Sequence, residues 1–196
     1  NGSATITVTV NDGQSLNNTV SQTFTVTVDA VNDAPALNSI ANVSINENVG
    51  AQIVNLAGIG TGAANETQTL AITATSSNPS LIPNPAVSYT SPSATGSLSF
   101  TPVTDANGTA TITVTVNDGQ VANNAFSRTF TVTVLGVNNA PTLDAISAVS
   151  VTEDSGAQTV NLAGISTGAV DETQTLTITA TSSNPSLIPN PTVSYS

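Results

Sequence analysis

The 196-residue sequence contains no cysteine, histidine, lysine, methionine or tryptophan, and these absences exclude several classes of function. Without cysteine the chain can form no disulfide bond, and it lacks the thiolate and imidazole ligands of the usual zinc sites. The residues that most often serve as a general base or nucleophile near neutral pH are missing too. We therefore predict that the chain is not an enzyme.

Positive charge is almost absent as well. Twelve Asp and Glu residues stand against one basic residue, Arg128, which gives a net charge of −11. A surface this anionic repels nucleic-acid phosphates and anionic lipids, so cations are the expected small partners. The sequence also has no initiating Met, no secretion signal and no apolar run long enough to cross a bilayer. We expect no membrane insertion in this segment, and we expect it to be a window of a longer chain.

Aromatic residues make up only 3% of the chain, whereas Thr, Ser, Val, Asn and Ala dominate it. Val, Ile and Thr are stiff at their first side-chain torsion and suit a pleated surface. Ten prolines and thirteen glycines divide the sequence into short runs. No segment shows helical periodicity, and the composition is typical of an all-β protein.

A long internal repeat organises the sequence. The stretch NGSATITVTVNDGQ at Asn1 returns as NGTATITVTVNDGQ at Asn107, an offset of 106 residues, and about seven in ten aligned positions are identical. A period this long corresponds to a whole domain. With the boundary at the connector VNDAP, residues 1–30 are the C-terminal strands of one repeat, residues 31–136 a complete repeat, and residues 137–196 the N-terminal part of the next.

Within the complete repeat, apolar residues alternate with polar ones over seven short stretches. Turn signals such as SSNPSLIPNP and NDGQ separate these stretches. Seven strands in ~100 residues predict tandem seven-stranded immunoglobulin-like β-sandwiches. The expected strands contain, in order, Val43 and Ile45; Val54 and Leu56; Leu70, Ile72 and Ala74; Val87 and Tyr89; Leu98 and Phe100; Ile112, Val114 and Val116; and Phe130, Val132 and Val134.

Three short motifs resemble those of cadherin domains. INENVG (Ile45–Gly50) is similar to the first-strand Glu-Asn motif, and VTVNDGQ (Val114–Gln120) to the A-x-D-x-G element. TFTVTVDAVNDAP (Thr23–Pro35) resembles the last strand and its linker. The unit length and connector are closer still to the cadherin-like tandem repeats of large bacterial surface adhesins. The resemblance covers the whole chain and implies an extracellular or cell-surface location.

The resemblance also implies calcium at each junction, because cadherin linkers and both flanking domains supply its ligands. Calcium takes six to eight oxygen ligands, which a short linker can gather only with help from the domains it joins. The residues carried over for the first junction are Asp29, Asn32, Asp33, Glu66 and Asp118. Those for the second junction are Glu47, Asp105, Asn138, Asn139, Asp171 and Glu172.

The linkers depart from the cadherin pattern. The aspartate–proline spacing in DAVNDAP is shifted by one residue, and at the second junction Asp29 and Asp33 are replaced by Leu135 and Asn139. Fewer carboxylates weaken calcium binding, so we expect the second site to be weaker or to hold fewer ions. Simpler roles stay open, because Asp118 also lies in an NDG turn signal and Glu47 suits a solvated strand edge.

The leading functional hypothesis is an extender repeat of a large bacterial adhesin or surface fibre, stiffened at its junctions by calcium. Its partners are then neighbouring repeats of the same chain, or like molecules in a fibre. One alternative is a module that binds glycans or other cells. Another is a filament in which residues 1–30 of one molecule complete the unit begun by residues 137–196 of the next. Neither of these pieces contains a counterpart of Ser91–Ala106.

Overall fold

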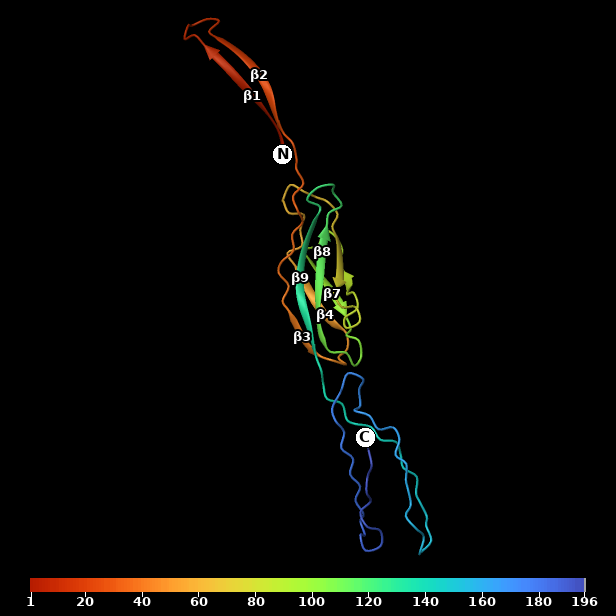
Figure 1. Ribbon diagram of the computed structural model, residues 1–196. Coiled ribbons are helices and arrows are strands. Elements are labelled where there is room, and N and C mark those ends of the chain that lie inside the picture. The colour runs from red at the N-terminus through yellow and green to blue at the C-terminus, as the bar shows by residue number, and fades with distance from the viewer. Residues whose placement is uncertain (196) are drawn as a thin grey trace.

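The computed structural model describes residues 1–195 as an elongated molecule with three parts in series. Figure 1 shows an N-terminal hairpin, a central β-sandwich and a C-terminal segment that follow one another along the long axis. Among the described residues there is no helix long and apolar enough to span a bilayer.

The central part is a two-layer sandwich of seven strands. One sheet has the order β3-β9-β8-β5 and the other β4-β7-β6; β3 pairs with β9 in parallel, and the other pairs are antiparallel. Each strand coincides with one of the predicted apolar stretches, so the all-β sandwich prediction is confirmed. The strands are β3 (Val43–Asn46), β4 (Gln52–Ala57), β5 (Ala71–Ser76), β6 (Ala86–Ser88), β7 (Thr95–Phe100), β8 (Gly108–Asn117) and β9 (Ala125–Leu135).

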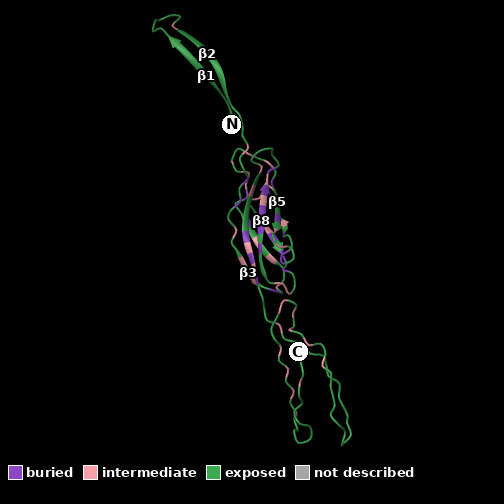
Figure 2. Ribbon diagram, viewed as in Figure 1, coloured by how far each residue is buried: buried purple, intermediate pink, exposed green. Residues whose placement is uncertain are grey.

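The core lies between these two sheets, and Figure 2 shows that buried residues are concentrated in this part of the molecule. Period-two alternation turns every second side chain of a strand inward, and β8 shows this from Ala110 to Val116. Aliphatic side chains from both sheets and from the loop at Leu81 fill the interior. The fully buried large side chains are Leu56, Ile82, Leu98, Ile112, Val114, Val116, Val132 and Val134.

The N-terminal part is a two-stranded hairpin of β1 (Gly2–Asn11) and β2 (Thr19–Val28). Its register, from Gly2 opposite Val28, repeats that of β8 and β9, where Gly108 lies opposite Val134. Every residue of β1 and β2 is exposed, because no second sheet covers them.

The C-terminal segment, residues 137–195, repeats the sequence of β3 to β6 but contains no strand among its described residues. One isolated bridge joins Thr142 to Ser166, at the position that Ala36 and Gly60 occupy in the sandwich. In the sandwich, β3 and β5 pair with β9 and β8, and β4 and β6 pair with β7. The segment lacks these partner strands, so its backbone has no ladder to join.

Candidate cation site at the unit junctions

Asn32 fixes the connector that enters the sandwich. Its Nδ2 donates to Asp118 Oδ2 at 2.9 Å and to the Ala122 carbonyl at 3.0 Å. Its Oδ1 accepts a hydrogen bond from Gln68 Nε2 at 2.7 Å, and its backbone carbonyl accepts one from Asn123 Nδ2 at 3.0 Å. Asn32 therefore connects the linker by hydrogen bonds to the two loops at this end of the sandwich.

Asp118 makes the predicted turn contact and also contacts the linker. Its Oδ1 accepts from the Gln120 backbone N–H at 2.9 Å, which is the local contact of the NDG turn. Its Oδ2 accepts from Asn32, and its side chain is only 3% exposed. The equivalent Asp12 makes the same turn contact, with Gln14 N–H at 3.0 Å, but lies in the exposed hairpin. Asp118 is thus buried where the sandwich and its linker surround the turn, and the same turn is exposed in the isolated hairpin.

Glu66 holds the next residue of the connector. Its Oε1 accepts from the Asp33 backbone N–H at 2.8 Å, whereas its Oε2 is buried without a hydrogen-bond partner. The adjacent loop approaches the linker closely at Gly62, which has a φ of +100°. A Cβ placed there would lie 2.2 Å from the Ala34 carbonyl oxygen. Glycine is therefore required at this contact.

At the second junction, Glu47 of the sandwich holds the linker that leaves it. Glu47 Oε1 accepts from the Val137 backbone N–H at 2.6 Å, and its own N–H donates to the Leu135 carbonyl at 2.8 Å. The side chain is 3% exposed, and its Oε2 has no hydrogen-bond partner. Glu47 is thus a buried carboxylate aimed at the linker, and not a solvated strand-edge charge.

The far side of this junction repeats the contacts of the first. Glu172 Oε1 accepts from the Asn139 backbone N–H, and Asn138 Oδ1 accepts from Gln174 Nε2 at 3.0 Å. Asp171 Oδ2 accepts from Asn107 Nδ2 of the sandwich at 2.6 Å, which bridges the two units directly. A hollow of about 330 Å³ lies here, lined by Asn107, Gly136, Val137, Asn138, Asp171, Glu172, Thr173 and Gln174.

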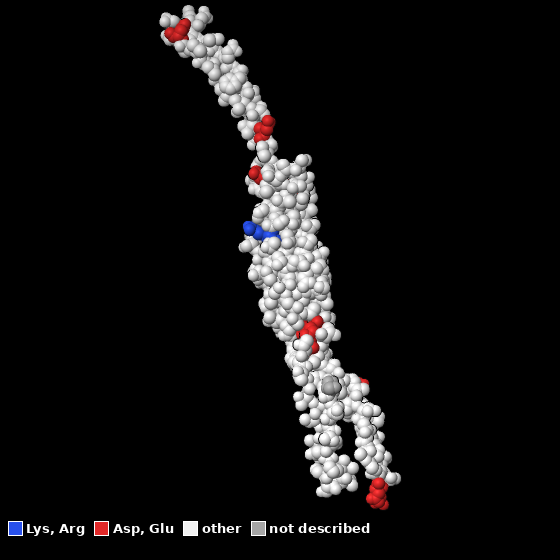
Figure 3. Space-filling model, in the orientation of Figure 1, with Lys and Arg blue, Asp and Glu red and all other residues white. Residues whose placement is uncertain are grey.

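Two predicted ligands lie apart from these contacts. Asp29 is exposed, and among residues 1–195 its carboxylate accepts no hydrogen bond. Asp105 is joined to Asn48 of the same unit by two reciprocal hydrogen bonds, each 3.0 Å long. On the face shown in Figure 3, acidic side chains lie near the junctions and at the outer ends, and the side of the sandwich between them carries none.

The donor chemistry of the junctions fits a hard cation. Six buried side-chain polar atoms in the described chain lack a hydrogen-bond partner, and four are carboxylate oxygens of predicted ligands. These belong to Glu47, Glu66, Asp171 and Glu172. Within residues 1–195, however, no three acidic side chains meet in an arrangement that could hold a metal ion. Further ligands would have to come from amide or carbonyl oxygens, or the carboxylates would have to move closer together.

Sequence reasoning missed the amide side chains that hold the linker. Gln68 and Gln174 contact Asn32 and Asn138 at the two junctions, and Asn107 contacts Asp171. The sequence did contain a signal for the two glutamines. The stretch ETQTL is identical in both repeats, although strand formation does not require a glutamine at its third position.

The fold and its anchored linkers define an immunoglobulin-like unit built for tandem arrangement. The family model of the bacterial Ig domain matches residues 32–134. The chain therefore belongs to the bacterial Ig domain family, which confirms the prediction of an immunoglobulin-like bacterial repeat. No curated protein matches the sequence.

Several solved structures are similar to the chain. The human desmocollin-1 ectodomain is 16% identical over 72% of this chain and 29% of its own, with a TM-score of 0.47. Domains 4 and 5 of the S-layer protein SbsC are 21% identical over 59% and 52%, with a TM-score of 0.34. The titin domains Z1Z2, in complex with telethonin, are 14% identical over 60% and 55%, with a TM-score of 0.38. The chain thus spans from about a third to about half of the length of these proteins.

Proposed function

We propose that the chain is a run of extender repeats from a large bacterial extracellular adhesin or surface fibre, and that calcium stiffens its junctions. Membership of the bacterial Ig domain family supports the role as extender repeats. The high sequence identity between the repeats suits a protein in which each repeat serves to add length. The observation that carries the calcium part is the buried Glu47 carboxylate, which has one oxygen on the linker and the other without a partner.

Charge balance supports a cation at this place. Burying a carboxylate is costly unless a positive charge or hydrogen bonds compensate it. The chain has one basic side chain, and Arg128 is engaged elsewhere: its Nε donates to the Leu37 carbonyl, and its guanidinium lies 4.8 Å from the centroid of the Phe126 ring. Each of Glu47, Asp171 and Glu172 accepts one hydrogen bond, and a positive charge for the remaining partnerless oxygens would have to come from solution.

Calcium suits this junction better than magnesium does. Its coordination shell is larger and more adaptable, and it accepts carbonyl and amide oxygens beside carboxylates. Glu47 contacts the linker from the sandwich, and Glu172 contacts it from the following unit. An ion that joins both groups would remove the hinge freedom of the linker and offset the repulsion between the carboxylates. Consecutive sandwiches would then behave as a rod.

The direct test is calcium binding by isothermal titration calorimetry of the wild-type chain, Glu47→Gln and the matched control Glu153→Gln. Glu153 occupies the repeat position of Glu47 but is exposed. Wild type is expected to bind in the range of extracellular modules, at a Kd of about 10⁻⁴–10⁻³ M. Glu47→Gln should weaken binding at least ~10-fold, because even outer-shell changes at metal sites have effects of that size.

Glu153→Gln should bind calcium as the wild type does. The proposal fails if wild type shows no heat of binding up to ~10 mM calcium, which is above the range of extracellular sites. Equal affinities of wild type and Glu47→Gln would likewise remove Glu47 from the site.

A further inference from the structure

The complete unit contains one Asn–Gly pair, Asn107–Gly108, and this pair lies at the second junction. In such a pair the backbone nitrogen of the glycine can attack the asparagine side chain, because glycine has no Cβ to hinder the approach. Both residues are exposed, and Gly108 has a φ of +130°. Gly108 also begins β8, where it lies opposite Val134 at the last position of the β8–β9 ladder. Strand ends open at little cost, so the Gly108 nitrogen can leave the ladder and reach the Asn107 side chain.

Related positions in the same unit are protected from this reaction. Asp118 also precedes a glycine, but its side chain is 3% exposed and both carboxylate oxygens accept hydrogen bonds. Asn78 and Asn84 precede prolines, whose nitrogen carries no hydrogen and cannot attack. Of these four positions, Asn107 is the one where both sequence and exposure favour the reaction.

Asn107 is also the side chain that joins the sandwich directly to the following unit. Its Nδ2 donates to Asp171 Oδ2 at 2.6 Å, while Asp171 Oδ1 is buried without a hydrogen-bond partner. The linker passes close to this contact, and a Cβ at Gly136 would lie 3.3 Å from Asn107 Nδ2. A change in the charge of Asn107 therefore acts on Asp171 and on the linker.

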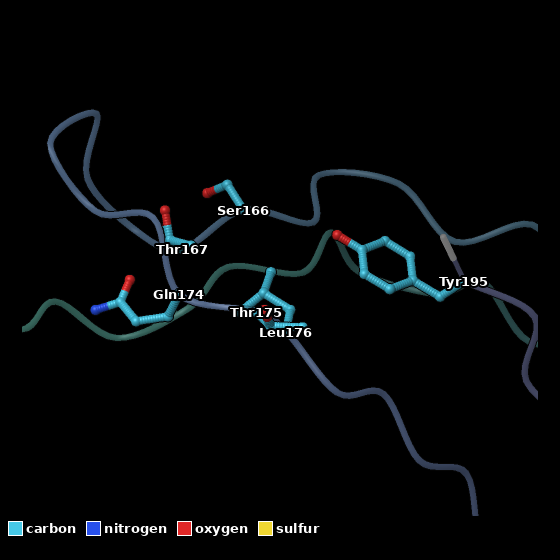
Figure 4. Close-up of a pocket in the computed structure, with 6 residues that line it drawn as sticks. All are labelled: Ser166, Thr167, Gln174, Thr175, Leu176 and Tyr195. Carbon is cyan, nitrogen blue, oxygen red and sulfur yellow. The ribbon is translucent and has the colours of Figure 1, made fainter.

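The hollow of about 330 Å³ beside Asn107 offers no positive charge. Among the described residues that line it, none is basic. Gln174 lines it as well, and Figure 4 shows the side chain of Gln174 extending away from Tyr195. Its amide turns to the linker, where Nε2 donates to Asn138 Oδ1 at 3.0 Å. A negative charge added at position 107 thus has no partner in this hollow except a cation from solution.

We propose that Asn107 is a deamidation site and that its conversion to aspartate adds a carboxylate to the cation site of the second junction. The effect on calcium rests on the proposed function, whereas the conversion itself does not. In the first step the Gly108 nitrogen bonds to Asn107 Cγ, the Cγ–Nδ2 bond breaks, and ammonia leaves with the Gly108 amide proton. Water then opens the cyclic imide on either side, which gives aspartate or isoaspartate. The net change is the hydrolysis of one amide, and it needs no redox partner.

The conversion reverses the role of position 107. Asn107 donates a hydrogen bond to Asp171, whereas an aspartate at this position repels Asp171, because two like charges lie side by side. In chelator, the aspartate form should therefore hold the second junction less firmly than the asparagine form does. In calcium, the new carboxylate supplies a charged oxygen, and affinity rises with the number of charged ligands. Deamidation thus makes the second junction more dependent on calcium.

The first test is mass spectrometry of the full chain after incubation at mildly alkaline pH, with peptic peptides sequenced by fragmentation. Asn107 is expected to gain the mass of the amide-to-carboxylate exchange, while Asn78 and Asn84 in the same sample stay unchanged. Asn107→Gln should abolish this gain, because the longer side chain closes a larger and less favourable ring. Conversion at Asn107 no faster than at Asn78 and Asn84 would overturn the proposal.

The second test is calorimetric calcium binding by wild type, Asn107→Asp and the charge-matched control Asn55→Asp. Asn55 is exposed in the middle of β4, away from the junction. Asn107→Asp reproduces the aspartate product and should bind calcium about 10-fold more tightly than freshly purified wild type, because ligand charge tunes affinity. Asn55→Asp should match wild type.

An unchanged or lower affinity of Asn107→Asp would contradict the added carboxylate ligand. Failure of the proposed function is distinguishable from failure of the modification. If wild type binds no calcium, the proposed function fails, and the calcium effect of position 107 fails with it. The mass gain at Asn107 still decides whether the modification takes place, because it is measured without calcium.

Discussion

Replacing Ile112 by alanine is expected to lower the free energy of unfolding of the sandwich by about 2–5 kcal/mol. The same replacement at Ile6 should change it by less than about 0.5 kcal/mol. Both residues lie in the sequence ATITVTVNDGQ, so local propensity and pattern are the same. Ile112 is fully buried between the sheets, whereas Ile6 lies on the uncovered hairpin. The difference between the two variants therefore measures tertiary packing alone.

Amide hydrogen exchange of β8 and β9 in dilute solution provides the measurement, because it reports on the sandwich strand by strand. Protection factors in β8 should fall in Ile112→Ala and stay at wild-type values in Ile6→Ala. Equal losses in both variants would mean that the hairpin belongs to the same cooperative unit as the sandwich. The conclusion that the hairpin lies outside the hydrophobic core of the sandwich would then be incorrect.

Gly62→Ala should destabilise the end of the sandwich that holds the first linker by about 1–3 kcal/mol. A side chain at this position adopts an unfavourable backbone conformation and meets the Ala34 carbonyl oxygen at 2.2 Å. Because the linker backbone cannot yield without losing the Asp33–Glu66 contact, the loop and the linker should separate. Exchange protection of the Asp33 amide, which donates to Glu66, should drop most.

Gly60→Ser is the matched control for this experiment. A Cβ at Gly60 meets no atom within 4 Å, and the following repeat carries Ser166 at the same position. This variant should keep wild-type protection at Asp33. If Gly62→Ala behaves like Gly60→Ser, the close packing of loop and linker is not a determinant of junction structure.

The seven strands of the sandwich could be predicted from the sequence, because their apolar residues alternate with period two and turn signals separate them. The residues Ile112, Val114 and Val116, which the sequence placed in one expected strand, lie in β8 and are completely buried. The same alternating pattern is not sufficient to form strands in residues 137–195, where the equivalents of β3 and β5 form no strand. A strand exists only beside its partner, and pairing between distant segments cannot be derived from local periodicity.

The candidate site could be predicted only in part. The resemblance located Glu47, Glu66, Asp171 and Glu172 at the junctions, where their partnerless oxygens lie. It could not show that one oxygen of each Glu side chain holds a linker backbone N–H, because such contacts depend on the path of the linker. Nor could it show that Asp105 turns to Asn48 of its own unit, since that contact crosses 57 residues of sequence.

Stiffening of the second junction by calcium is the central claim, and a distance measurement across that junction tests it most directly. Thr129→Cys on β9 and Ser155→Cys in the C-terminal segment are exposed and would be the only thiols in the chain, so both accept spin labels cleanly. Pulsed electron spin resonance should give a broad distance distribution in chelator and a narrow one in millimolar calcium, with no narrowing when Glu47→Gln is added. Distributions of the same width with calcium and with chelator would contradict the calcium-stiffened junction.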